Sequence, residues 1–350
     1  MSHSYDALLV VSFGGPEGPD DVLPFLENVL RGKNVPRERM LAVAEHYQHF
    51  GGRSPINDQN RALIAGVEAE LAAQGPPLPV FFGNRNWHPL LADTLAEMGR
   101  RGVRRALGLF TSAYSSYSGC RQYRENIAEA QRQVGSAAPE IHKLRAFFNH
   151  PRFIAAQVDR VRQAWQQIPP PRRAATDLIF TAHSIPQAMA DGCDYAAQLN
   201  ETGRLIAERL GDGPASRPRW DLAYQSRSGP PSQPWLGPDI GDRLRQAQAA
   251  GVRDVVVAPI GFLSDHMEVL YDLDTEAKEL ADQLGLNLVR AATVGVHPEL
   301  ITMIRELIVE RTTPGAARPA LGTLGPRPDE CATGCCPAGI RPSPPAAKEK

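Results

Sequence analysis

The chain has 350 residues, of which 42% are hydrophobic and 22% are charged. These fractions are close to those of globular proteins and argue against a disordered, collagen-like or disulfide-scaffold chain. With 38 basic and 39 acidic side chains the net charge is -1, so no overall field would attract nucleic acid or an anionic membrane. The length predicts two domains.

The first apolar run, residues 7–13, has no basic segment before it and stops at Gly14-Gly15, unlike a secretory signal. No apolar run approaches the roughly 20 residues that a membrane-spanning helix needs. Five cysteines are too few and odd in number for a disulfide framework, and they favour free thiols or metal ligands. We therefore expect a cytoplasmic protein without stable membrane insertion.

Strand-like apolar runs alternate with helical patterns along the whole chain. This alternation predicts parallel α/β units. The expected strands are residues 7–13, 80–83, 106–110, 143–147, 178–182, 222–224, 255–260 and 286–289. Apolar residues at spacings of three and four predict helices over residues 60–74, 122–134, 153–167 and 240–250.

The two sets of four strands can be laid over each other in order. Residues 13–16 and 183–186 each follow a strand and lie 170 positions apart, and Gly-Val-Arg at 102–104 recurs at 251–253. His150-Pro151 likewise matches His297-Pro298. Co-linear matches of this kind predict tandem copies of one α/β unit. Because ligands of open parallel sheets bind beyond the carboxyl ends of the strands, we expect the chemistry in the loops that follow them.

His183 stands where an expected strand becomes a loop, in Thr181-Ala182-His183-Ser184-Ile185-Pro186. A neutral imidazole there can bind a metal or accept a proton near pH 7. The alternative is a histidine held by local hydrogen bonds.

Three acidic residues, Glu268, Asp272 and Glu276, follow another expected strand at intervals of four. On a helix this spacing stacks the carboxylates on one face, where they repel unless they are solvated, protonated or bridged by a cation. An exposed acidic stripe is the alternative. The position after a strand end favours a path that hands a hard divalent cation inward.

Cationic and hydroxyl side chains near glycine-rich turns suit carboxylate recognition, namely Arg31, Arg53, Ser54 and Tyr123. An aromatic set that includes Phe13 would either flank a flat apolar ring or pack in the core. Gly14-Gly15 before a helix suggests a phosphate loop, but no nucleotide-binding pattern accompanies it.

Beyond Thr313 the composition shifts to Pro, Gly and Ala, which predicts an extended tail that buries little surface. The tail carries three closely spaced thiols, Cys331, Cys335 and Cys336, and such thiols suggest soft-metal ligation. Three ligands are one short of the four that zinc or an iron–sulfur cluster prefers, so a fourth must come from Cys120 or Cys193. We favour Cys120. A redox switch and chance clustering remain alternatives.

Taken together, these motifs resemble those of the ferrochelatase family over roughly residues 5–312, and the tail resembles that of iron–sulfur-bearing bacterial members. The motifs that carry the resemblance are Ser12-Phe13-Gly14-Gly15-Pro16, Gly51-Gly52-Arg53-Ser54-Pro55-Ile56, Asn84-Arg85-Asn86-Trp87, Thr181-Ala182-His183-Ser184-Ile185-Pro186, Gln225-Ser226-Arg227-Ser228-Gly229-Pro230 and Gly261-Phe262-Leu263-Ser264-Asp265-His266-Met267-Glu268.

The resemblance implies an α/β fold of two Rossmann-like, chelatase-type domains, residues 1–148 and 149–312, each with a parallel four-stranded sheet flanked by helices. The tail then spans residues 313–350. The resemblance also implies a porphyrin cleft between the domains and insertion of Fe2+ into the porphyrin with release of two protons. The substrate of the soluble branch is coproporphyrin III. The alternatives are protoporphyrin IX, a non-catalytic porphyrin or haem carrier, and a cobalt chelatase for sirohydrochlorin.

For the site residues, the resemblance implies that His183 and Glu268 bind the iron and manage the protons, with Asp272 and Glu276 on the metal approach route. It places Ser54 and Tyr123 against the porphyrin and Arg31 and Arg53 in substrate-facing segments. Phe13 lies in another porphyrin-facing segment, but it replaces a tyrosine that ligates iron in several members and cannot coordinate. The cluster would be a [2Fe-2S] held by Cys120, Cys331, Cys335 and Cys336. We further expect a monomer with transient handover partners.

Overall fold

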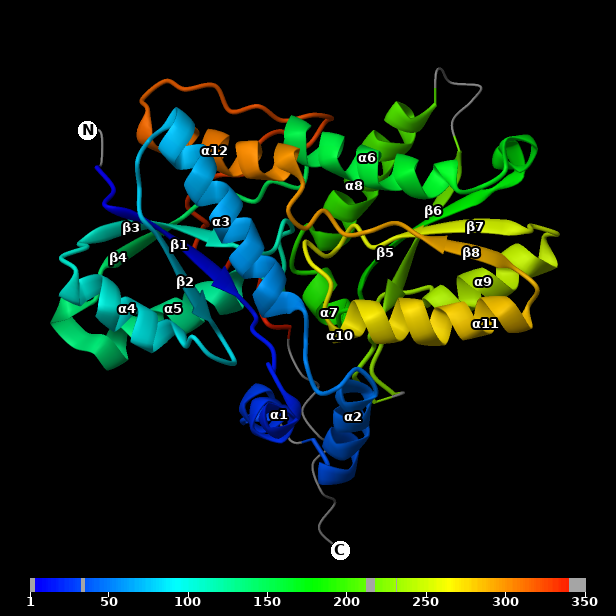
Figure 1. The fold of residues 1–350 in the computed structure, drawn as a ribbon, viewed down its shortest axis with the longest axis horizontal. Helices are drawn as coiled ribbons and strands as arrows, with labels where there is room; N and C mark the ends of the chain where they lie inside the picture. The colour runs from blue at the N-terminus through cyan, green and yellow to red at the C-terminus, as the bar shows by residue number, and fades with distance from the viewer. Residues whose placement is uncertain (1–3, 33–34, 212–217, 231, 340–350) are drawn as a thin grey trace, which may run out of the picture.

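A computed structural model describes residues 4–32, 35–211, 218–230 and 232–339. Within these ranges the strands form two four-stranded parallel sheets, which lie on either side of the molecule in Figure 1. The strands are β1 (Ala7–Ser12), β2 (Val80–Asn84), β3 (Arg105–Phe110), β4 (Glu140–Lys143), β5 (Asp177–His183), β6 (Arg219–Gln225), β7 (Asp254–Ala258) and β8 (Asn287–Arg290). The expected α/β architecture is confirmed.

Helices connect successive strands and cover both faces of each sheet. They are α1 (Val22–Leu30), α2 (Arg37–His49), α3 (Ile56–Gln74), α4 (Leu91–Arg100), α5 (Gln122–Val134), α6 (Pro151–Gln166), α7 (Gln187–Ala190), α8 (Tyr195–Leu210), α9 (Ile240–Ala249), α10 (Met267–Val269), α11 (Lys278–Gln283) and α12 (Pro298–Thr312). A π-helical segment, Leu270–Ala277, joins α10 to α11.

The two sheets have the same topology. Their strand orders are β2-β1-β3-β4 and β6-β5-β7-β8, so the second strand of each half crosses to one edge and the third and fourth build the other. At the carboxyl ends Ser12 is in register with Asn84, and His183 with Gln225. The loops after β5 and β6 therefore start side by side. The exact domain boundaries stay a prediction.

Hydrogen bonds support the duplication in detail. The Val103 amide donates to the Met98 carbonyl, and the Val252 amide donates to that of Ala247, each at 3.0 Å. The His150 and His297 side chains cap α6 and α12 by accepting backbone N–H groups two residues on. Side-chain acceptors satisfy donors that a helix start leaves unpaired. The repeated sequence landmarks thus mark repeated turns and caps.

The fourth expected strand is displaced. Residues 143–147 were expected to pair, but β4 ends at Lys143, and Leu144 makes only one ladder-like bond, from its amide to the Gly108 carbonyl. The segment that follows is apolar because it is buried in the core, and Arg145 within it turns to Glu310 of α12. Burial without pairing mimics a strand in the sequence.

The inner faces of both sheets share one hydrophobic core. From the first sheet, Leu8 and Val10 pack into it with α3, and from the second, Leu178 and Phe180 pack with α6 and α8. Helix α12 contributes Ile304 and its neighbours to the same core. The outer faces pack separately, against α4 and α5 in the first half and against α9 and α11 in the second. Figure 1 shows α12 at the opposite end of the molecule from α1 and α2, with α3 running from beside α12 toward them.

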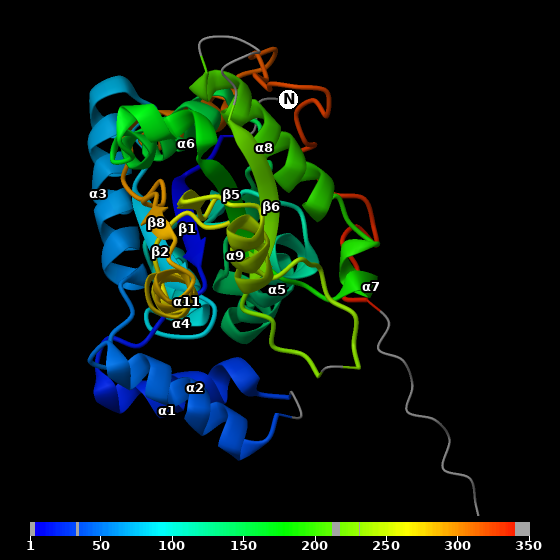
Figure 2. The same cartoon turned by 90° about the vertical axis from the view of Figure 1, so that its right-hand side faces the viewer.

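Helices α1 and α2 lie beneath both sheets and form a small apolar cluster of their own (Figures 1 and 2). Phe25 is its centre, and its ring meets those of Phe13, Tyr47 and Trp87 edge-on at centroid distances of 5.9–6.2 Å. Among the described residues, no helix has the length and apolar composition required to cross a bilayer.

The described part of the tail buries little, as expected, with Cys336 its only buried residue. This part, residues 313–339, has no helix or strand, as expected, but it is bound at several points along the body. The Asn149 side chain donates to the Leu321 and Gly325 carbonyls, and Glu201 accepts from the Thr323 amide. Hydrogen bonds to its backbone, rather than an apolar face, attach the tail to the body. Figure 2 shows the red end of the tail beside α7.

Candidate active site

His183 is the last residue of β5. Its Nδ1 is hydrogen-bonded to the Ser184 carbonyl, and its own carbonyl accepts from the Tyr195 hydroxyl at 3.1 Å. Because a carbonyl oxygen can only accept, Nδ1 carries the proton, and Nε2 is the nitrogen available for a metal or a second proton. These hydrogen bonds fix the orientation of the His183 ring, and they do not use Nε2, which faces a second residue.

That second residue is Glu268, whose Oε1 lies 3.3 Å from His183 Nε2. The His183 side chain is 32% exposed and that of Glu268 is 48% exposed, so both groups are reachable from solvent. Burial alone would lower the pKa of His183, but the charge and hydrogen bond of Glu268 outweigh it and raise the pKa to about 9. Near pH 7 the pair shares a proton between imidazole and carboxylate.

His266 caps the short helix that carries Glu268. Its Nδ1 accepts the Glu268 backbone N–H at 3.2 Å and lies 3.7 Å from Glu268 Oε2. Burial, reinforced by the charge of His183, keeps the pKa of His266 below its ordinary value. A neutral His266 caps the start of the helix and does not compete for the proton that His183 and Glu268 share.

Asp272 lies one turn beyond Glu268 and is held from β6. The Ser226 hydroxyl donates to Asp272 Oδ2, and the Gln225 side-chain amide reaches both the Glu268 carbonyl and Asp272. Burial raises the pKa of Asp272 to about 7, and the nearby charge of Glu268 adds to the increase. Near neutral pH this carboxyl can take up or lose a proton.

The expected acidic helix is present, but its main part is π-helical rather than α-helical. Asp272 and Glu276 both lie in the π-helical segment, and Glu276 is exposed. Its pKa is nevertheless raised, first by partial burial and then by the charges of Asp239 and Glu279. The carboxylates thus run from the surface at Glu276 to the His183–Glu268 pair.

Gln225, Ser226 and His266 belong to motifs that carry the family resemblance, but the sequence alone indicates no role for them. The structure places Gln225 beside His183 because β5 and β6 are neighbours in the sheet. Ser226 has a positive φ of 61°, a conformation uncommon outside glycine, and its hydroxyl is aimed at Asp272. For Gln225 and Ser226 the available signal was their position at the end of a strand, as for His183.

Phe13 follows β1, and its side chain is among the exposed large hydrophobic ones, at 37%. Its ring packs against Phe25 on one side, and the Arg85 guanidinium lies 5.6 Å from its centroid on another. Phe25 in turn contacts Tyr47, whose pKa is raised by burial and by the charge of Glu268. An aromatic series therefore links Phe13 to the neighbourhood of Glu268.

The other residues expected to face the porphyrin have different surroundings. Arg31 is exposed at the end of α1, and Arg53 is exposed but pairs with Asp58 at 2.6 Å. Ser54 is buried, and its hydroxyl lies near the Ile56 amide. Tyr123 is buried under Arg85, whose guanidinium stands 4.5 Å from the ring centroid.

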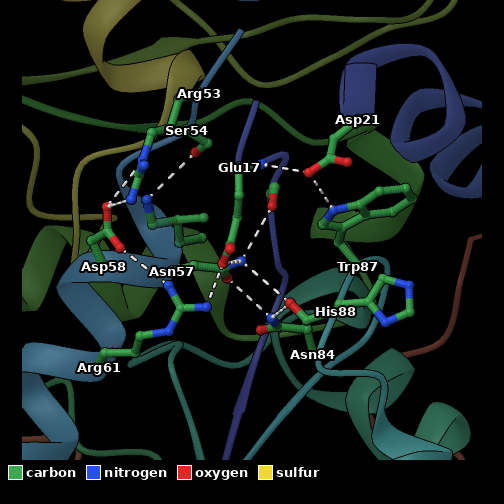
Figure 3. A network of polar contacts seen from close by, with 12 residues as sticks. Glu17, Asp21, Arg53, Ser54, Asn57, Asp58, Arg61, Asn84, Trp87 and His88 are labelled. Atoms are coloured by element: carbon green, nitrogen blue, oxygen red, sulfur yellow. Dashed lines mark hydrogen bonds and ion pairs between the residues drawn. The ribbon is translucent and has the colours of Figure 1, made fainter. Parts of the chain in front are cut away.

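A polar network fixes the loops that hold these residues (Figure 3). At its centre the Asn57 amide donates to the Gly15 carbonyl and to Glu17, and the Asn84 amide donates to Asn57. Arg61 pairs with both Glu17 and Asp58. The loops after β1 and β2 and the start of α3 are thus joined into one framework.

The four expected cluster cysteines lie in a series of pairwise contacts, but they are not gathered tightly enough to form a metal-ligand group. Buried Cys120 is hydrogen-bonded to Cys331, Cys331 contacts Cys335, and the Cys335 and Cys336 sulfurs are 3.5 Å apart. The hydrogen bond from Cys120, aided by Lys143 and Arg124, lowers the pKa of Cys331 to about 5. Cys193 lies close by, where it lines a cavity of about 340 Å³ together with Cys335 and Cys336.

Within the described ranges, no group of three or more His, Cys, Asp or Glu side chains is arranged tightly enough to hold a metal ion. His183 and Glu268 together offer two candidate ligand atoms, Nε2 and Oε1. A pair of this kind binds a divalent ion more weakly than a closed four-ligand site does. Such weak binding suits an ion that must be passed on.

Comparison with known proteins places this arrangement in a family. The ferrochelatase family profile matches residues 5–312. A ferrochelatase of Rhodopirellula baltica is 56% identical over 95% of this chain and 93% of its own. A coproporphyrin III ferrochelatase of Streptomyces coelicolor is 51% identical over 98% and 96%, and one of Frankia alni is 54% identical over 95% and 86%.

Solved structures support the fold. The chelatase SirB of Bacillus subtilis, determined with Fe3+, aligns with a TM-score of 0.55 at 11% identity, over 89% of this chain and 96% of its own. The fold is that of the two-domain chelatases. The chain belongs to the ferrochelatase family, as the sequence motifs predicted.

Proposed function

We propose that the protein inserts Fe2+ into coproporphyrin III, exchanging the metal for the two pyrrole protons. The observation that carries the proposal is the His183–Glu268 pair, in which Nε2 and Oε1 lie 3.3 Å apart. One imidazole and one carboxylate provide two ligands for Fe2+ and two acceptors for protons. Both roles are needed because each metal that enters the ring displaces two protons.

The pair works as an exchanger. In the metal-free protein the proton between His183 and Glu268 occupies the Nε2 lone pair that Fe2+ needs. Arrival of Fe2+ displaces that proton to solvent, and departure of Fe2+ into the macrocycle frees the pair to accept the two pyrrole protons, one on Nε2 and one on the carboxylate, of which one then passes to solvent and restores the starting state. His183 keeps its Nδ1 proton throughout because the Ser184 carbonyl holds it.

Asp272 and Glu276 deliver the ion. Exposed Glu276 meets Fe2+ at the surface, and Asp272 lies between it and Glu268. The raised pKa of Asp272 means that an incoming cation has a proton to displace here as well. A route with partly neutralised carboxylates attracts the ion without trapping it.

Recognition of the porphyrin rests on Phe13 and on the arginines near it. The exposed Phe13 ring offers an apolar surface for a flat macrocycle, but it has no atom that could coordinate iron. Arg31 and Arg53 supply charge for the four carboxylates of coproporphyrin III. Ser54 and Tyr123, which are buried, reach the porphyrin only if the loops around them shift. The names of the Streptomyces coelicolor and Frankia alni relatives support this substrate.

A direct assay tests the proposal. Purified protein is given Fe2+ without oxygen together with either coproporphyrin III or protoporphyrin IX, and metalloporphyrin formation is followed by absorbance. We expect faster turnover with coproporphyrin III. Faster use of protoporphyrin IX would reject the substrate assignment, and no turnover with either would reject the activity.

We also propose that Cys120, Cys331, Cys335 and Cys336 hold a [2Fe-2S] cluster. The support is that four thiols, the number such a cluster needs, lie in successive contact and that the surroundings of Cys331 lower the pKa of its thiol. When bound, the cluster would supply a cross-link between the tail and the first domain, and a redox-sensitive one. The cytoplasmic location, the monomeric state and the handover partners remain predictions.

A further inference from the structure

Arg290 holds the segment that carries the iron-handling carboxylates. It is the last residue of β8, and its side chain is only 17% exposed. Its guanidinium forms a two-pronged contact with Asp274, with Nη2 at 2.8 Å from Oδ2 and Nε on Oδ1. Its Nη1 lies 3.2 Å from Asp265 Oδ1. One side chain therefore binds residues on both sides of Glu268 and Asp272.

The segment needs such support because of its conformation. Residues Leu270–Ala277 are π-helical, and π-helical turns are rare and occur mostly at functional sites. Asp272 is held by Ser226, just after β6, whereas Asp274 is held by Arg290. In the sheet order β6-β5-β7-β8, these two strands are the opposite edges. The wide turn is thus anchored at two edges of one sheet.

Asp265 carries the connection further, to the first half of the molecule. Its backbone N–H donates to the Gln59 side chain of α3 at 2.9 Å. Gln59 directly follows Asp58, the partner of Arg53. Arg290 therefore links the metal route of the second half to the framework of Figure 3 in the first half.

We propose that Arg290 is a positioning residue for metal insertion, which sets the placement of Glu268 and Asp272 by holding Asp265 and Asp274. The inference rests on the proposed function. In this role Arg290 contacts neither metal nor porphyrin. Its loss should therefore lower the affinity for metal more than the affinity for porphyrin. An Arg–Asp cluster that only stabilised the fold would affect both alike.

The test compares full-length Arg290→Met, Arg290→Lys and Asp274→Asn proteins with the wild type. Zn2+ binding to the porphyrin-free proteins is measured by calorimetry, porphyrin binding by fluorescence quenching, and turnover by separate KM values for metal and porphyrin. We expect Arg290→Met to weaken Zn2+ binding and raise the metal KM about tenfold or more, as loss of a residue that orients metal ligands does, with porphyrin binding within about twofold. Arg290→Lys should recover part of the loss, because it keeps the charge but not the fork.

The matched control is Arg245→Met, which removes an exposed arginine paired with Asp242 and should change neither constant. If Arg290→Met does not fold, the milder Asp274→Asn, which removes one carboxylate oxygen, decides in its place. Unchanged Zn2+ affinity, or equal weakening of metal and porphyrin binding, would overturn the inference. A wild type that binds Zn2+ but does not metallate porphyrin would reject the proposed function and leave the Zn2+ comparison valid.

Discussion

His183 Nε2 and Glu268 Oε1 lie 3.3 Å apart, at the end of a strand and the start of a helix that are separated by 85 positions in the chain (268 − 183). The first is oriented by the Ser184 carbonyl and the second by the His266 cap. Neither side chain is free to turn away without losing a hydrogen bond. The pair is therefore a preorganised site for a proton or a divalent cation, but not for both at once.

Replacing His183 by alanine should separate binding from chemistry. We expect metallation to fall by about 100- to 10,000-fold, because a ligand and a proton acceptor are lost together, while porphyrin affinity stays close to that of the wild type. Fluorescence quenching measures the affinity, and anaerobic absorbance measures the rate. Turnover at the wild-type rate would remove His183 from the mechanism.

Asp272→Asn should make the protein more stable above neutral pH. The folded protein raises the pKa of this carboxyl from 3.8 to about 7, so ionisation progressively weakens folding as the pH rises from about 4 to 7, and the penalty persists above 7. Asparagine has no such penalty, and its carbonyl can still accept the Ser226 hydroxyl. We expect a gain of about 1 to 3 kcal/mol at pH 8 in urea unfolding.

The same comparison at pH 5 should show a smaller gain, and metal insertion should slow at both values because the delivery route has lost a carboxylate. An Asp272→Asn protein that is less stable than the wild type at pH 8 would contradict this, because it would show that the folded protein favours the ionised Asp272 carboxylate.

Cys331→Ser should abolish the visible absorbance of the cluster in protein purified without oxygen, because the thiol closest to a thiolate at pH 7 is lost. Cys193→Ser serves as the control and should keep the spectrum. If Cys193→Ser loses the spectrum and Cys120→Ser keeps it, the fourth ligand has been assigned to the wrong residue.

Arg145→Met should destabilise the protein strongly. Arg145 is almost fully buried, and its two bonds to Glu310 and one to the Pro319 carbonyl join the first half, α12 and the tail. Its loss leaves Glu310 buried with only the half-exposed Arg318, which costs about 3 kcal/mol. Arg101→Met, which breaks an exposed pair with Glu97, should cost less than about 0.5 kcal/mol in the same unfolding assay.

Much of the fold was predictable because strands buried on both faces produce continuous apolar runs, and these stand out between amphipathic helices. The error at β4 has the same origin: the residues after Lys143 are apolar because α12 covers them, not because they pair. The points at which the tail is attached to the body were not predictable, because its anchors are backbone carbonyls and arginines. Such contacts leave no periodic pattern in the sequence.

The candidate site was predictable where a chemical group stands at the end of a strand, as for His183, or opens a stripe of carboxylates with helical spacing, as for Glu268. The roles of Gln225 and Ser226 were not, because they depend on β6 lying beside β5, and strand order cannot be read from periodicity alone. The role of Arg290 depends in the same way on an edge strand reaching a helix that precedes it in the chain.

The most direct measurement of proton-for-metal exchange is the affinity of the porphyrin-free protein for Zn2+ between pH 6 and 8. Glu268 raises the pKa of His183 to about 9, so the metal must displace a proton throughout this range. Affinity should therefore rise about tenfold or more per pH unit. In Glu268→Gln the charge and hydrogen bond that do most to raise the pKa of His183 are lost while the lowering effect of burial remains, so this pKa falls and the dependence of Zn2+ affinity on pH should weaken. An affinity in the wild type that does not change with pH, or the same slope in both proteins, would contradict the exchange.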